Sequence, residues 1–166
     1  MVVVAIVAIL AAVVIPNWTR EGRNKKYDPE ISAMFTEISV KEDQYKMEQG
    51  NGAYLAAAQC PGAPVPAGAD WNAACNSVAG WSSINVNATE SKIMCTYEVQ
   101  AGCAGATCTV AAAPAVPGGF TAAPATLAGA WFFIVATCDM DANGGTMAKF
   151  LMSSWDTKQQ QQNYGS

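Results

Sequence analysis

The sequence contains no histidine. Without an imidazole, the chain cannot form a Ser-His-Asp or Cys-His catalytic arrangement, or a metal site with histidine ligands. Aromatic residues make up only 9% of the chain, which predicts a modest hydrophobic core in its folded part. The missing histidine lowers the weight of every enzymatic interpretation, and we expect a protein that is not an enzyme.

Basic residues are also few. Nine Lys and Arg stand against thirteen Asp and Glu, which gives a formal net charge of -4. A protein that binds nucleic acid through charge alone needs a basic surface. The charge balance argues against such a protein, and no sequence-specific nucleic-acid partner is expected either.

Charged and polar side chains are absent from the start of the chain. The apolar run ends at Ile15, and Pro16 follows it. A helix that is apolar on every face has no side for water, so this run must lie in lipid or inside a packed assembly. Fifteen residues reach roughly 22 Å as a helix, against about 30 Å of hydrocarbon in a bilayer. The predicted membrane or assembly segment comprises Val2, Val3, Val4, Ala5, Ile6, Val7, Ala8, Ile9, Leu10, Ala11, Ala12, Val13, Val14, Ile15 and Pro16.

Three simple explanations of this run are open. A cleaved secretory signal needs a basic start and a small-x-small cleavage site, and the run offers neither in good form. A buried helix of a soluble domain fits the length, and a plain membrane anchor fits the composition. None of the three explains why a proline and a long polar helix follow directly.

The run resembles the N-terminal helix of type IV pilins and the related pseudopilins. In that family an aromatic residue and Thr-Leu-Ile-Glu precede a run such as Met-Ile-Val-Val-Ala-Ile-Ile-Gly-Ile-Leu-Ala-Ala-Ile-Ala-Ile-Pro, which residues 1–16 follow without a gap. The family's leader peptide and first mature residues, including the glutamate, are absent here. About six more residues would complete a span of about 20, so we expect a clipped chain or a late start.

One position inside the run departs from the family. Ala8 stands where pilins usually have Gly, and in assembled pili the segment from that Gly to the proline is often unwound. Alanine favours a helix over glycine by about 1 kcal/mol. The resemblance therefore implies a segment that is harder to unwind in this chain.

The resemblance implies a structural subunit of a type IV pilus-like filament, which assembles as a helical homo-oligomer through its apolar helix. It also implies an inner-membrane location before assembly, a cell-surface filament afterwards, and contact with a pilus or secretion assembly machinery. The alternatives are a pseudopilin of a type II secretion system and a solitary membrane-anchored binding domain outside the cytoplasm.

Residues 1–49 are expected to form one helical unit, with residues 1–16 apolar and residues 17–49 amphipathic. Apolar residues recur on one face of a 3.6-residue period at Tyr27, Ile31, Met34, Phe35, Ile38 and Tyr45. On the opposite, wet face the spacing predicts two ion pairs, Glu37–Lys41 and Glu42–Lys46. Asp28 and Pro29 are typical of a helix start, so the helix is expected to kink or restart there.

Residues 50–166 are expected to form a globular head in an α+β fold of the pilin type. Three segments are rich in strand-forming residues: Lys92–Gln100, Trp131–Cys138 and Met147–Trp155. They predict an antiparallel meander of three or four strands whose apolar face packs on the helix. Residues 56–90 and 102–129 are predicted to be connections, with the tryptophans of the first serving as packing anchors, and residues 159–166 a frayed tail.

The six cysteines all lie in the head, at Cys60, Cys75, Cys95, Cys103, Cys108 and Cys138. An even number behind an export-like N-terminus indicates disulfides, whereas a zinc site needs paired Cys-x2-Cys spacings that are absent here. About 15 pairings exist, and the sequence does not select one. We favour Cys60–Cys75 across a Pro- and Gly-rich loop, Cys95–Cys138 between neighbouring strands, and Cys103–Cys108 across a tight turn.

The basic residues directly after the apolar run predict the opposite orientation in the membrane from the one that the cysteines indicate. Arg20, Arg23, Lys25 and Lys26 would lie in the cytoplasm by the positive-inside rule. The cysteines place the same side of the membrane outside. We follow the cysteines, because a missing basic leader would reverse the comparison of charges.

A candidate calcium site lies between the last two predicted strands. Asp139, Asp141 and Asn143 match the first half of an EF-hand loop, but Phe150 stands where the bidentate Glu is needed. Asp, Asn and Gly also supply what an ordinary hairpin turn requires. We favour the turn and keep the three residues as a calcium ligand set to be tested; no other cofactor is expected.

Overall fold

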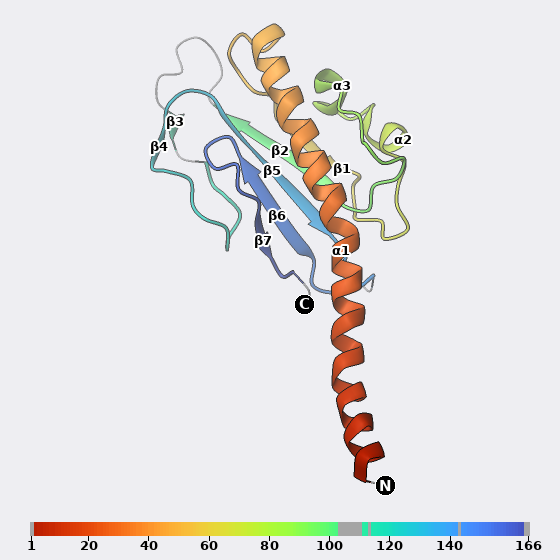
Figure 1. Cartoon of the computed structure of the whole chain (residues 1–166). Coiled ribbons are helices and arrows are strands. Elements are labelled where there is room, and N and C mark those ends of the chain that lie inside the picture. The colour runs from red at the N-terminus through yellow and green to blue at the C-terminus, as the bar shows by residue number, and fades with distance from the viewer. Residues whose placement is uncertain (1, 103–110, 113, 143, 165–166) are drawn as a thin grey trace.

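The computed structural model describes residues 2–102, 111–112, 114–142 and 144–164, with the backbone alone for residues 2–24 and 111–112. It contains one long helix and a five-stranded antiparallel sheet, so the fold is mixed α+β. The C-terminal half of the helix lies over one face of the sheet, and the N-terminal half projects away from the head (Figure 1).

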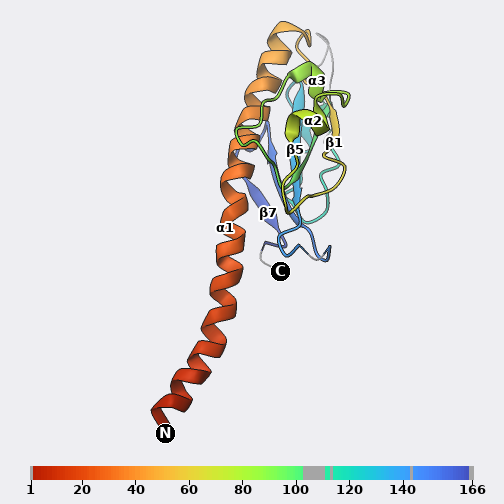
Figure 2. The same ribbon diagram turned by 90° about the vertical axis from the view of Figure 1, so that its right-hand side faces the viewer.

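Helix α1 spans Val2–Glu48 as one element and does not restart at Pro29. A proline inside a helix removes a backbone hydrogen bond and costs about 3 kcal/mol. The chain bears this cost at Pro29 because Tyr27 and Ile31, on either side, are both buried in the head. The helix bows gently below the head (Figure 2) and ends where Gly50 N donates to Tyr45 O at 2.7 Å.

The main sheet has the order β1-β2-β5-β6-β7, with every neighbouring pair antiparallel. The prediction of three or four strands was therefore too low. The strands are β1 (Ala57–Cys60), β2 (Thr96–Gly102), β5 (Trp131–Cys138), β6 (Ala148–Ser153) and β7 (Gln160–Gln162). A separate two-stranded sheet pairs β3 (Ala111–Ala112) with β4 (Thr126–Leu127).

Four of these strands formed in segments predicted to be irregular, and β3 and β4 both lie inside the expected connection 102–129. Strand β1 lies inside the expected connection 56–90, and β7 lies inside the expected frayed tail. Their residues are mostly Ala and Gln, which have little intrinsic preference for strands. Hydrogen bonds to β2 and β6 hold them in the sheet, and those partners are remote in sequence.

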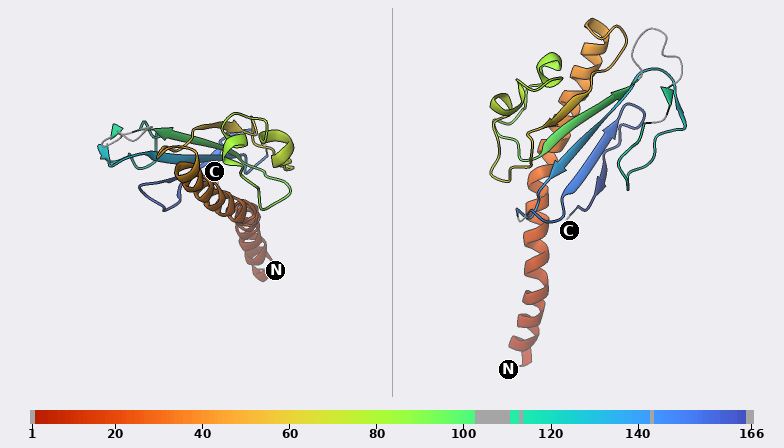
Figure 3. Two further views of the ribbon diagram at one scale, coloured as in Figure 1. Left: turned by 90° about the horizontal axis from the view of Figure 1, so that it is seen from above. Right: turned by 180° about the vertical axis from the view of Figure 1, so that it is seen from behind.

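The main core lies between α1 and the inner face of the sheet, as predicted. The helix contributes its periodic apolar face, and alternate residues of β2, β5 and β6 face it. Seen from above, the helix lies on one side of the sheet (Figure 3). The principal buried residues are Tyr27, Ile31, Met34, Phe35 and Ile38 from the helix and Tyr97, Val99, Phe132, Ile134, Ala136 and Phe150 from the sheet.

A second, smaller cluster covers the outer face of the sheet. Phe133, Val135 and Leu151 are buried there, and Val116 and Phe120 from the 114–121 loop pack on them. Strand β5 is consequently buried on both faces. This explains why its sequence is continuously apolar, a pattern expected of a fully buried strand.

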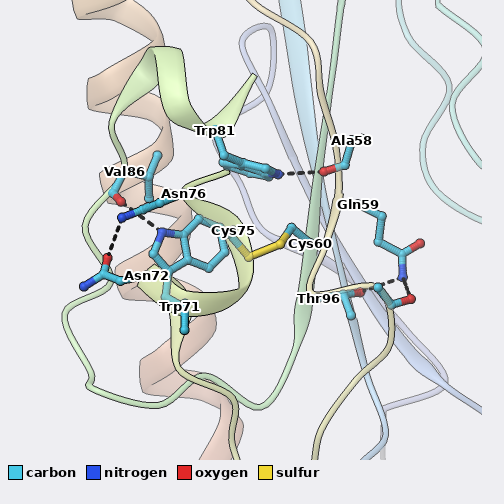
Figure 4. Close-up of a disulfide and its surroundings, with 12 residues drawn as sticks. Ala58, Gln59, Cys60, Trp71, Asn72, Cys75, Asn76, Trp81, Val86 and Thr96 are labelled. Carbon is cyan, nitrogen blue, oxygen red and sulfur yellow. Dashed lines mark hydrogen bonds between the residues drawn. A yellow bond between two sulfur atoms is a disulfide. The ribbon is translucent and has the colours of Figure 1, made fainter. Parts of the chain in front are cut away.

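Two short helices, α2 (Trp71–Cys75) and α3 (Trp81–Ile84), lie beside β1. Their tryptophans are buried and meet edge to face, with ring centroids 5.0 Å apart. Trp81 Nε1 donates to Ala58 O at 2.6 Å, and the Cys60–Cys75 disulfide joins β1 to α2 (Figure 4). The two tryptophans thus anchor the packing of the 56–90 segment, as predicted.

Candidate functional site

The predicted membrane or assembly segment, Val2–Pro16, forms the far end of the projecting part of α1. Its backbone is helical throughout, and it extends away from the sheet (Figures 1 and 2). Among the residues whose side chains the structure describes, no helix is both long and apolar enough to cross a membrane.

Along α1 from its N-terminus, the first described hydrogen bonds to the head are made by Tyr27 and Asp28. Tyr27 Oη donates to Asp139 O at 3.1 Å, which ties the helix to the end of β5. Tyr164 Oη donates to Asp28 Oδ2 at 2.8 Å, which ties it to the segment after β7. These contacts fix the level at which the helix leaves the head.

Glu30 provides a second attachment, one turn further along the helix. Its carboxylate is buried and accepts three hydrogen bonds from the start of β2: Oε2 from Met94 N at 2.9 Å, Oε1 from Cys95 N at 3.0 Å and from Tyr97 Oη at 2.9 Å. Burial raises the pKa of Glu30 above its usual value, although the three hydrogen bonds oppose the shift. Burial also raises the pKa of the Tyr97 hydroxyl.

Glu42 attaches the C-terminal end of α1. It is fully buried, and its Oε2 accepts a hydrogen bond from Leu55 N at 2.9 Å, just before β1. Its Oε1 is buried and has no hydrogen-bond partner among the described residues. Burial, assisted by the nearby charge of Asp43, raises the pKa of Glu42 from 4.5 to about 7. This carboxyl is therefore largely protonated in mildly acidic solution.

The predicted Glu42–Lys46 ion pair on the wet face is wrong, because Glu42 faces the head. Lys46 Nζ instead donates to Tyr54 Oη at 3.2 Å and lies 4.4 Å from the centre of that ring. Tyr54 Oη donates in turn to Asp43 Oδ1 at 3.1 Å. Burial and Asp43 raise the pKa of Tyr54 to about 12.

The two buried glutamates were missed as functional residues. The available signal was their spacing: counted from Tyr27, Glu30 and Glu42 fall at offsets 3 and 15, within the apolar stripe of the helix. A carboxylate in such a stripe needs donors from the packed partner. The donors are backbone N–H groups of β2 and of the segment before β1, which no local pattern identifies.

The described part of the chain contains two disulfides, and both are among the favoured pairings. Cys60–Cys75 joins β1 to α2, and Cys95–Cys138 joins the start of β2 to the end of β5. The second lies beside the Glu30 and Tyr27 attachments, so the sheet is cross-linked at the level where it holds the helix. The proposed pair Cys103–Cys108 lies outside the described residues.

The candidate calcium ligands lie in the turn from β5 to β6. Asp139 is mostly buried, and its Oδ2 accepts a hydrogen bond from Gly144 N at 3.1 Å, which is the local bond that a turn requires. Asp141 is half-buried, and Asn143 lies outside the described residues. No group of three or more Cys, Asp or Glu side chains in the described part of the chain is placed to hold a metal.

Taken together, these contacts position one long helix rather than assemble reactive groups. Backbone groups of the head and the hydroxyls of Tyr97 and Tyr164 bond to side chains of α1 between residues 27 and 42. Comparisons with protein-family models, with curated proteins and with solved structures found no match.

Proposed function

We propose that this chain is a structural subunit of a type IV pilin-like filament. Its apolar helix end lies in the inner membrane before assembly and packs against copies of itself afterwards. The head then covers the outside of a cell-surface filament. The observation that supports this most is the division of α1 into a projecting apolar end and a half attached to the head.

The apolar surface of α1 can lie in the membrane and later in the filament core, because lipid and a bundle of apolar helices are both apolar surroundings. Alanines at positions 5, 8, 11 and 12 leave little bulk, which lets neighbouring helices approach closely. A contact between copies that does not close on itself generates a helical fibre. An assembly machinery would be needed to move each subunit from the membrane into the fibre.

The attachments of the head suit this role. A subunit that transmits load along its helix must not let the head detach, and bonds at Tyr27, Glu30 and Glu42 spread the attachment over four turns. Disulfides such as Cys95–Cys138 strengthen small domains that function outside the cytoplasm. Both features support a head exposed on a cell surface.

The test is disulfide cross-linking of the full-length chain in a bacterial host that carries a type IV assembly machinery. Among the described residues no native cysteine is free. The variant Ala8→Cys places a thiol on the projecting end of α1, and oxidation is expected to link copies into dimers. The matched variant Lys158→Cys, on an exposed position of the head, is expected to remain monomeric.

Monomers alone in the Ala8→Cys sample would refute the filament proposal and favour a solitary membrane-anchored binding domain. Where cross-links form, electron microscopy of the same cells separates two kinds of assembly. Long surface fibres indicate a pilus, and short periplasmic assemblies indicate a pseudopilin of a secretion system.

A further inference from the structure

The charge of the chain is divided sharply between a short stretch of α1 and the rest. Residues 17–26 contain four of the nine basic residues and one acidic residue, which gives this stretch a net charge of +3. The other five basic and twelve acidic residues leave the remainder of the chain at -7. We call the four basic residues Arg20, Arg23, Lys25 and Lys26 the collar.

The structure places the collar between the apolar end and the head. The first buried contact of α1 with the head is at Tyr27, and Lys25 and Lys26 just before it are exposed. The helix backbone is continuous from Pro16 to Tyr27, so the rise per residue fixes the distance along the axis. At 100° per residue, the four collar positions are spread around the helix rather than lying on one side.

The collar lies at the depth of lipid headgroups if the apolar run ends at the edge of the hydrocarbon. The headgroup layer is about 5 to 8 Å thick on each side of a bilayer. Arg20 lies about 6 Å beyond Pro16, Arg23 about 10 Å and Lys26 about 15 Å. Arg20 is thus within the layer, Arg23 is just outside it, and the two lysines lie within about one Debye length of it, about 8 Å at physiological salt.

Two acidic residues of the head, Glu90 and Asp141, line hollows beside Lys26, and others lie further from the apolar end. Asp28, the first of them along the helix, is about 18 Å beyond Pro16 and accepts a hydrogen bond from Tyr164. At that distance from the headgroups, salt screens most of the repulsion between the head and an anionic surface. Along the helix, the net charge of +3 on residues 17–26, with Glu21 counted, therefore lies nearer to the headgroups than Asp28 does.

A shallow hollow of about 250 Å³ opens beside α1 at the same level. Lys26 from the helix and Lys92 from the head both line it, together with Met94 and Glu90. Glu30 also borders the hollow, but its carboxylate accepts three hydrogen bonds from the head. The carboxylate of Glu90 offsets part of the charge of the two ammonium groups, so the hollow adds little to the positive charge of the collar.

We propose that the collar binds anionic phospholipid headgroups while the subunit waits in the membrane. This inference rests on the proposed function, because it needs the apolar end of α1 to be inserted in a bilayer. The bound lipids would hold the helix at one depth with the head upright, ready for extraction. They would be released when the helix leaves the membrane.

Trp18, two residues from both Pro16 and Arg20, provides the reporter. The full-length chain is reconstituted in phosphatidylcholine vesicles that contain the same fraction of either brominated phosphatidylcholine or brominated phosphatidylglycerol. Bromine quenches tryptophan only at near contact, and the other four tryptophans belong to the head. The anionic lipid is expected to associate more strongly, by about fivefold for each basic residue within the headgroup layer.

The double variant Arg20→Gln, Arg23→Gln is expected to lose most of the preference for the anionic lipid, because it removes the two collar residues nearest to the headgroups. The control Lys149→Gln, Lys158→Gln, with the same change of charge on the head, is expected to keep the preference. Equal quenching by both lipids in the unmodified chain, or loss of the preference in the control, overturns the inference while leaving membrane insertion intact. Absence of quenching by either lipid refutes insertion, and with it both the proposed function and this inference.

Discussion

The buried carboxyl of Glu42 predicts that this head becomes less stable as the solution turns from acidic to neutral. The folded state holds the proton more tightly than the unfolded state, because burial raises the pKa of Glu42 from 4.5 to about 7. Unfolding therefore releases a proton between these two pH values, and the free energy of unfolding falls as pH rises through that window. Glu30, whose pKa is also raised by burial, adds a change in the same direction.

The size of the effect follows from the two pKa values of Glu42. At 1.36 kcal/mol per pH unit, the difference between 4.5 and about 7 corresponds to about 3 kcal/mol. Domains of this kind are stable by about 5 to 15 kcal/mol, so the loss is a substantial part of the total. The physical cause is a buried charge with one hydrogen bond at Oε2 and none at Oε1.

The substitution Glu42→Gln isolates this carboxyl. The amide oxygen can still accept the hydrogen bond from Leu55 N, and the charge is gone. A buried amide NH2 in place of Oε1 costs about 1 to 3 kcal/mol, so the variant is expected to gain about 1 kcal/mol at pH 8 and to lose about as much at pH 5. The matched control is Glu48→Gln, an exposed glutamate two turns further along the same helix.

The assay is urea unfolding followed by tryptophan fluorescence, at a series of pH values from 4 to 8, with the apolar helix end kept in detergent micelles. The wild-type midpoint is expected to fall with pH, the Glu42→Gln midpoint to fall much less, and the control to follow the wild type. A wild-type midpoint that is flat or rises from pH 5 to pH 8 would refute the reasoning. So would a Glu42→Gln variant that keeps the full wild-type slope.

Three further predictions concern the other attachments. Glu30→Gln is expected to destabilise the head by about 2 kcal/mol at acidic pH, because both oxygens of Glu30 accept N–H donors and an amide NH2 would face one of them. The loss is expected to be smaller at neutral pH, where the variant no longer buries a charge, and an unchanged urea midpoint at acidic pH would contradict this. Replacing Cys60 and Cys75 by Ala is expected to lower the free energy of unfolding by about 3 kcal/mol, the value for a loop of 15 residues, and a loss below about 1 kcal/mol would contradict it. Calcium is expected to leave the melting temperature unchanged, since Asp139 already bonds within its own turn; a calcium-dependent rise in calorimetry would show that the 139–147 turn binds the ion.

Strands whose residues favour extended structure could be predicted from the sequence, and the others could not. Strand β5 occupies the predicted residues Trp131–Cys138, because aromatic and β-branched residues favour a strand and pack well on a sheet. Strands β1 and β7 consist of residues with no such preference. They form because they pair with the edges of β2 and β6. Those partners are remote in sequence, so the residues of β1 and β7 alone do not predict the pairing.

The helix shows the same division. The period of its apolar residues predicted which face packs on the sheet, and that face is buried. The local signal of Asp28 and Pro29 predicted a break or kink, and the helix does not break there. The burial of Tyr27 and Ile31 offsets the few kcal/mol that a proline inside a helix costs. The neighbouring residues in the sequence do not show how large this burial is.

The sequence alone determined the apolar N-terminal end, the amphipathic helix that follows it, the α+β class and the central strand. Each of these depends on composition or on a short period, which neighbouring residues specify by themselves. The tertiary structure decided the number of strands, the continuity of α1 through Pro29, and the burial of Glu30 and Glu42. Those features depend on hydrogen-bond donors and packing partners that the fold brings from more than ten residues away, and their energies exist only once the helix lies on the sheet.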